Sequence, residues 1–318
     1  MMSENVKASE IRRIYFYSDY LKETYGEKVY KLPINLPGTC PNRDGKISTG
    51  GCIYCAESGA NYDALSNTLS VGEQLSINRT YIGEKYKAKK FIAYFQNFTG
   101  TYVPLAEFKS RLEQAALDGV VEISVSTRPD CLTEEYLLAM REAEEKTGVR
   151  MSLELGLQTA NDETLKKINR GHSVADFVRA ADLCKIYSLP FCVHVILNLP
   201  WDTREDVIKT AQLISKVGAE GVKLHSLNIL KGTLLAQMYA RDEINAPERE
   251  EYVERALLFL KNIDSGICVH RLIGRAPEEI SVVENFNASW RSVYDEIVNE
   301  MERRDYIQGM DVCKEFCL

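Results

Sequence analysis

Short apolar segments alternate with longer amphipathic segments along most of this chain, starting near residue 29. The short segments have the length and composition of buried strands, whereas apolar residues recur with helical spacing in the longer ones. Repeated strand and helix units of this kind are typical of a parallel sheet covered by helices. We therefore predict an α/β fold with strands near 30–36, 90–96, 120–126, 150–157, 190–197 and 221–228.

The segments between these strands carry helix start signals as well as helical spacing. Thr133 precedes two glutamates, and Asp202-Thr203 precedes another acidic group, as is common at helix N-termini. Six strands joined by right-handed helical crossovers fit an open doubly wound sheet or a partial barrel. We predict helices at 71–87, 104–118, 133–147, 161–187 and 203–217, then a helix near 249–263, a short apolar segment at 266–273 and a long helix near 278–303.

Composition narrows the class of protein only slightly. With 45% hydrophobic and 27% charged residues, the chain has the composition of an ordinary globular protein. We expect a cytoplasmic protein, because the first residues mix charges and no apolar run reaches the roughly 18 residues of a membrane span. A net charge of −7 disfavours indiscriminate binding to nucleic acid, and the basic segment 79–90 forms either a local patch or a solvated helix face.

Three of the nine cysteines lie close together, directly after the first predicted strand. Cys40, Cys52 and Cys55 form a C-x11-C-x2-C arrangement in a glycine-rich loop. Grouped cysteines in the reducing cytosol more often bind metal than form disulfides, and thiolates suit iron–sulfur clusters and zinc. A structural zinc site normally has four protein ligands, whereas a three-cysteine [4Fe–4S] cluster leaves one iron open. A zinc site completed by a distant side chain is the alternative.

Other candidate residues stand in or just after the predicted strands, where barrel enzymes place their chemistry. Glu154 interrupts an apolar strand, and a buried carboxylate is costly without a partner. We interpret it as functional, with a salt bridge to an arginine inside the barrel as the structural alternative. Arg128 either binds a carboxylate through two parallel hydrogen bonds or pairs with Asp130. His194 and His225 either contact substrate or belong to the core.

Several segments resemble one branch of the radical S-adenosylmethionine (SAM) superfamily. The usual spacing in that superfamily is C-x3-C-x2-C, and this chain departs from it. The longer spacing, with CPNRDG followed by GGCIYC, resembles the bacterial radical SAM family related to the Elongator-type catalytic subunits. The resemblance extends through YFQNFTGTY at 94–102, STRPDC at 126–131, LELGLQT at 153–159, NRGH at 169–172, HVILNLP at 194–200 and KLHSLNILKGT at 223–233.

The resemblance implies a partial (β/α)6 TIM-like barrel of the radical SAM type. Residues 1–28 would form an N-terminal extension, 29–235 the core barrel and 236–318 a helical extension packed on that core. The implied cofactors are SAM and a [4Fe–4S] cluster held by the three grouped cysteines, with SAM on the open iron. The candidate cofactor-binding residues are Gln96, Asn97, Arg128, Glu154, Gln158, Arg170 and Ile196.

Within this set, Gln96 and Asn97 suit the SAM amino group, and capping of the next loop is the alternative for them. Glu154 and Gln158 suit the SAM ribose or adjacent substrate groups. Arg170, in the NRGH segment, suits the SAM carboxylate or a substrate phosphate.

Ile196 belongs to an expected adenine platform, where Asn198 replaces the glycine typical of the family. Cys313 and Cys317 would share a helix face, but a second cluster needs more ligands, so we interpret them as ordinary thiols.

The resemblance also implies a reaction. Electron transfer from the reduced cluster would cleave SAM to a 5′-deoxyadenosyl radical, with a flavodoxin or ferredoxin as reducing partner. Named members of the related family act on the wobble uridine of tRNA, so tRNA modification is the preferred function, and we expect no appended acetyltransferase domain. The alternatives are a radical SAM enzyme acting on a small metabolite or peptide, and a non-catalytic zinc or cluster module.

Overall fold

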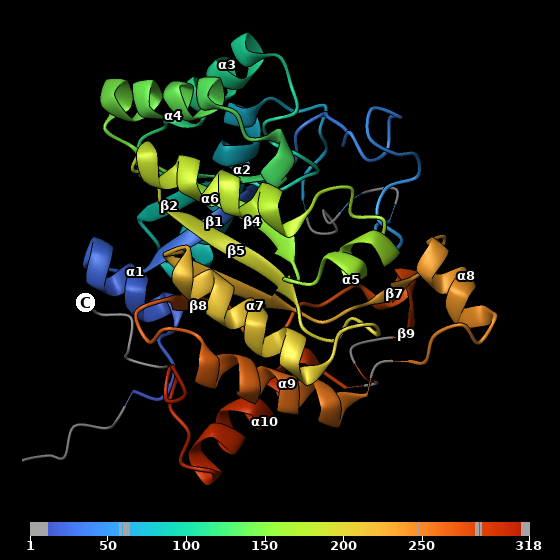
Figure 1. Cartoon of the computed structure of the whole chain (residues 1–318). Coiled ribbons are helices and arrows are strands. Elements are labelled where there is room, and N and C mark those ends of the chain that lie inside the picture. The colour runs from blue at the N-terminus through green and yellow to red at the C-terminus, as the bar shows by residue number, and fades with distance from the viewer. Residues whose placement is uncertain are drawn as a thin grey trace, which may run out of the picture.

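The computed structural model describes residues 12–56, 59, 64–246, 248–283, 286 and 288–312. Seven parallel strands form one curled sheet, and helices cover its outer face (Figure 1). This half-barrel confirms the predicted partial barrel and excludes the open doubly wound sheet. The strands lie side by side in the order β1 (Val29–Ile34), β2 (Lys90–Phe95), β3 (Val120–Thr127), β4 (Arg150–Gln158), β5 (Phe191–Ile196), β6 (Gly221–His225) and β8 (Cys268–Arg271).

Polar caps fix the starts of several helices. Ser70, Ser173 and Thr203 each accept a hydrogen bond from the backbone three residues on, and the acidic side chain there bonds back to the cap. Among the described residues, no helix is both long and apolar enough to cross a bilayer. The helices are α1 (Tyr17–Tyr25), α2 (Val71–Tyr86), α3 (Leu105–Ala115), α4 (Glu134–Thr147), α5 (Asp162–Lys167), α6 (Val174–Ile186), α7 (Arg204–Lys216), α8 (Leu234–Ala240), α9 (Arg249–Asn262) and α10 (Trp290–Arg303).

Alternation along the strands separates the core from the barrel interior. In β4, Leu153, Leu155 and Leu157 are fully buried and belong to the main hydrophobic core. The intervening residues, including Glu154 and Gly156, point to the opposite face of the sheet. The same strand therefore supplies both the apolar packing under the helices and the polar groups of the interior.

Helix α1 covers the N-terminal end of the barrel. Tyr25 donates a hydrogen bond from its hydroxyl to Glu122 at the start of β3 (2.6 Å), and the Tyr20 hydroxyl accepts one from Arg150 at the start of β4 (2.5 Å). The Tyr17 ring stacks on His270 of β8, with ring centroids 3.7 Å apart. Access to the interior is therefore left to the opposite end, where the parallel strands finish.

Three predicted elements differ from the structure. The helix predicted at 161–187 is two helices, because Asn169 and Gly171 have positive φ angles of 50° and 76° and turn the chain between them. The long helix predicted at 278–303 begins only at Trp290 and is preceded by a short 3-10 helix, η2 (Glu278–Ile280), and by β9 (Ser281–Val283), which pairs with β7 (Ile229–Leu230).

The third difference is the apolar segment at 266–273, which supplies β8 as a seventh strand next to β6. The division of the chain at residue 235 stays a prediction, although the segment after it contributes this strand to the sheet. Cys313 and Cys317 lie outside the described residues.

Candidate active site

The C-terminal ends of the strands surround a cavity of about 520 Å³. Cys40, Cys52 and Cys55 all line it, so the loop after β1 reaches the same space as the interior polar residues. Asn97 is absent from the described lining. The predicted cofactor-binding residues that do line the cavity are Gln96, Arg128, Glu154, Gln158, Arg170 and Ile196.

Backbone hydrogen bonds fix the second half of the cysteine loop. The amide of Cys55 donates to the carbonyl of Cys52 (2.9 Å), which forms a tight turn between these two side chains. Between them, Ile53 donates to the carbonyl of Ile168 (3.1 Å) and accepts from the amide of Leu235 (2.9 Å). These three apolar residues also share a small buried cluster. The turn is therefore held by the end of α5 and the start of α8.

The NRGH segment holds the other side of the same loop. Asn42 donates through Nδ2 to the carbonyl of Asn169 (2.5 Å), and Asn169 donates through Nδ2 to the carbonyl of Gly51 (2.8 Å). A Cβ at Gly171 would lie 2.4 Å from Asn42 Oδ1, so only glycine allows this approach. Arg170 directs Nη1 at the sulfur of Cys52 (3.7 Å). Asn42 and the NRGH segment thus position the cysteine loop.

Burial affects the ionisation of the grouped cysteines. Burial and the neighbouring Cys52 raise the pKa of the Cys55 thiol. A bound metal offsets this cost, because it favours the thiolate. The three cysteines are therefore a candidate metal site.

Glu154 is the centre of a buried charge network. Its carboxylate forms ion pairs with Lys31 and Lys223 and accepts a hydrogen bond from the Tyr94 hydroxyl (2.5 Å). Burial alone raises the pKa of Glu154, but Lys223 and Lys31 outweigh it and hold the pKa well below its usual value. The alternative of an arginine salt bridge is wrong, because both cationic partners are lysines.

A chain of hydrogen bonds extends from Glu154 toward β8. His194 Nε2 lies 2.7 Å from a Glu154 carboxylate oxygen, and His225 Nε2 lies 3.2 Å from His194 Nδ1. Arg271 donates from Nη2 to His225 Nδ1 (2.6 Å). Burial lowers the pKa of His194 to about 4 and that of His225 well below its usual value, so both rings are neutral near pH 7. One tautomer assignment, with both rings protonated at Nε2, satisfies the whole chain.

Arg128 takes the structural alternative predicted for it. It pairs with Asp130 through two hydrogen bonds of 2.9 Å, while Nη1 lies 3.9 Å from the sulfur of Cys40.

Asn97 and Asn198 form hydrogen bonds between loops. Asn97 donates to Asn35 Oδ1 (3.0 Å), which ties it to the loop after β1. Asn198 accepts a hydrogen bond from the amide of Leu227 (2.7 Å) and thereby joins the loops after β5 and β6.

Sequence reasoning missed Tyr94, Lys223 and Arg271, all of which line the cavity. One signal was present for Lys223, because it stands two residues before His225 and so shares its strand face. Arg271 ends a strand that was not predicted, and its position beside His225 depends on pairing between β6 and β8.

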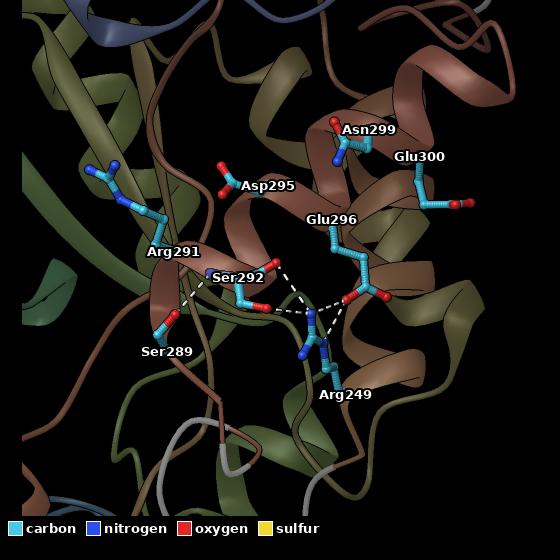
Figure 2. A pocket seen from close by; sticks show the side chains of 8 residues that line it. All are labelled: Arg249, Ser289, Arg291, Ser292, Asp295, Glu296, Asn299 and Glu300. Atoms are coloured by element: carbon cyan, nitrogen blue, oxygen red, sulfur yellow. Dashed lines mark hydrogen bonds and ion pairs between the residues drawn. The ribbon is translucent and has the colours of Figure 1, made fainter.

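A second hollow lies on the surface between α9 and α10, and none of the three grouped cysteines lines it. Figure 2 shows Arg249 of α9 directed at α10, where it donates to Glu296 (2.6 Å) and to the Ser292 hydroxyl (2.9 Å). These contacts join two helices. We interpret the hollow as a structural contact between α9 and α10 rather than as a ligand site.

Comparison with known proteins assigns the family. The Radical SAM superfamily profile matches residues 36–214, and the Radical_SAM C-terminal domain profile matches residues 219–303. The protein YtqA of Bacillus subtilis is 32% identical over 299 residues, which cover 94% of this chain and 92% of YtqA. The chain therefore belongs to the radical SAM superfamily, as its resemblance implied.

Two further likenesses concern Elongator-type proteins. The tRNA uridine(34) acetyltransferase of Methanocaldococcus infernus is 29% identical over 160 residues, covering 49% of this chain and 29% of that enzyme. The solved structure of the M. infernus Elp3, lacking its N-terminus, superimposes with a TM-score of 0.66 at 19% identity. That superposition covers 88% of this chain and 64% of Elp3, and it shows a shared fold.

The cofactors of this superfamily are a [4Fe–4S] cluster and SAM, and the cavity fits them. Three cysteines, whose thiolates are soft ligands, line it, and Thr99 Oγ1 on the wall is buried without a hydrogen-bond partner. A buried polar atom of this kind is stabilised by a ligand that hydrogen-bonds to it. When bound and reduced, the cluster supplies the electron that cleaves SAM to methionine and a 5′-deoxyadenosyl radical. The chain is thus a radical SAM enzyme.

Proposed function

We propose that Cys40, Cys52 and Cys55 hold the cluster and that this enzyme modifies tRNA at the side chain of the wobble uridine. The choice of tRNA as substrate is supported by the likeness of half of this chain to a tRNA uridine(34) acetyltransferase. The proposal includes a flavodoxin or ferredoxin as electron donor and a cytoplasmic location, where thiols stay reduced and can bind metal.

The cavity gives the proposed cofactor contacts a physical basis. Gln96, Gln158 and Ile196 line it, and we propose that SAM binds beside them, with Ile196 offering an apolar surface to adenine. Glu154 is held ionised by two lysines, so it acts as a hydrogen-bond acceptor and not as an acid near neutral pH. Arg170 lies against Cys52 and Gly156, where it orients the cysteine loop and stays close to an anionic ligand at the open iron.

The test compares modified nucleosides in tRNA from cells that contain the protein and cells that lack it. Mass spectrometry of digested tRNA should reveal one modified uridine that disappears with the protein and returns with the wild-type chain. Cys55→Ala should not restore it, since that variant lacks one proposed cluster ligand, while Cys184→Ala, at a buried cysteine of α6, should. An unchanged profile would exclude tRNA and favour a metabolite or peptide, for which a 520 Å³ cavity is also large enough.

A further inference from the structure

Arg271 is a cation on the cavity wall that forms no ion pair with a described carboxylate. Its hydrogen-bond partner among the described residues is the neutral ring of His225. Its Nε atom is buried and has no hydrogen-bond partner. A guanidinium carries five donors in a fixed fork and cannot lose its charge in a protein. The unused donors and the unbalanced charge therefore need a ligand.

The described cavity wall carries more positive than negative charge around Arg271. Glu154 is the one carboxylate among the described residues of the cavity wall, and it already pairs with Lys31 and Lys223. Leaving a charge partly buried without a partner is costly, so proteins retain such an arrangement where a bound anion completes it.

Arg271 and the cysteine loop reach the same cavity from the two edge strands of the curled sheet. The loop follows β1, whereas Arg271 ends β8. A Cβ at Gly274 would lie 3.4 Å from His225 Nδ1 and 3.5 Å from Arg271 Nη2, so glycine keeps the space beside the guanidinium open. Ser226 and Asn228 line the same side of the cavity.

We propose that Arg271 and His225, beside Gly274, form a subsite for an oxyanion of the substrate. The shared chemistry is a pair of negatively charged oxygens, which a guanidinium binds through parallel hydrogen bonds. Under the proposed function this anion is a phosphate of the tRNA. Only the identity of the anion rests on that function, and the existence of the subsite does not. In a metabolite or peptide the same place would hold a carboxylate. Binding there would orient the substrate toward the radical.

Thermal unfolding of the full-length holoenzyme, prepared anaerobically, tests the subsite with inorganic phosphate and acetate as probes. Arg271→Gln should raise the unfolding temperature in the absence of both anions, because it removes an uncompensated charge. Arg249→Gln, which breaks a paired arginine, should lower it. Phosphate, acetate or both should stabilise the wild type, with binding weakened ~10-fold or more by Arg271→Gln and less by Arg271→Lys. The anion with the larger Arg271-dependent effect identifies the source.

Two results would overturn the subsite. One is an Arg271→Gln variant that is less stable than the wild type without anions and responds to phosphate and acetate as the wild type does. The other is an Arg271→Gln variant whose affinity for SAM, measured by equilibrium dialysis, falls as much as its affinity for the anions. Arg271 would then bind the SAM carboxylate. Since no RNA is present, either result leaves the tRNA proposal intact, and a failed nucleoside comparison leaves the subsite intact.

Discussion

At the scale of single residues, Glu154 carries the charge balance of the barrel interior. Its partners come from β1, β2, β5 and β6, and its side chain is only 1% exposed. Its two lysine partners, Lys31 of β1 and Lys223 of β6, are distant from it in sequence and come close to it because the sheet curls. Removal of one partner from a buried ion pair leaves the other charge without compensation.

We therefore expect Glu154→Gln to lower the free energy of unfolding by about 3–5 kcal/mol, measured by urea titration at pH 7.5. Glu296→Gln is the matched control, because Glu296 pairs with Arg249 at the partly exposed α9–α10 contact and should cost about 1 kcal/mol or less. Equal losses in the two variants would show that the interior network contributes no more than a surface pair.

The histidines predict how stability depends on pH. Burial lowers the pKa of His194 to about 4, whereas an unfolded histidine titrates near 6.5. Between these values the unfolded chain binds a proton that the folded chain does not, so stability falls as the pH falls from about 6.5 toward 4. The slope is up to ~1.4 kcal/mol per pH unit for each such histidine.

Urea titrations at pH 7.5, 6.5 and 5.5 measure this slope. His194→Gln removes one titrating group and should make the decline between pH 6.5 and 5.5 shallower than in the wild type, whatever its effect at pH 7.5. An unchanged slope would mean that His194 is protonated in the folded protein.

At the scale of elements, the contact between the cysteine loop and the NRGH segment predicts that Gly171→Ala loses iron. The new Cβ would clash with Asn42 Oδ1, and the loop would have to move. Gly148→Ala is the control, because Gly148 has a similar φ of 69° with nothing within 4 Å of its Cβ position. Both variants should lose about 1–2 kcal/mol of stability from the positive φ, but only Gly171→Ala should bind less iron.

The iron content of the two purified variants, measured per chain after identical anaerobic reconstitution, distinguishes the two effects. If both variants retain wild-type iron, the NRGH segment does not position the cysteine loop.

Element prediction succeeded where local pattern was sufficient. The first six strands were found because each has a buried apolar run of ordinary length, and the helices at 133–147 and 203–217 begin at the predicted Thr133 and Thr203 caps. It failed at β8 and β9, which have only four and three residues and exist through pairing with distant strands. Short strands of this kind carry too little periodicity to be distinguished from loops.

At the scale of the whole molecule, the curled sheet brings residues from every strand to one cavity. The cysteines and most candidate cofactor residues could be located from sequence, because they stand in or just after predicted strands. The lysine partners of Glu154 and the cation Arg271 could not, since charge pairing across a barrel depends on register between distant strands. The partner of Arg128 could be predicted, because Asp130 lies only two residues away in the sequence.

We propose that three cysteines hold a [4Fe–4S] cluster with one iron open to SAM, and electron paramagnetic resonance of the dithionite-reduced holoenzyme can detect both features. We expect a reduced-cluster signal from about four irons per chain, and g values that shift when SAM is added. The Cys40→Ala, Cys52→Ala and Cys55→Ala variants should lack this signal. A signal indifferent to SAM, or a colourless protein containing zinc, would show that the three cysteines hold no such cluster.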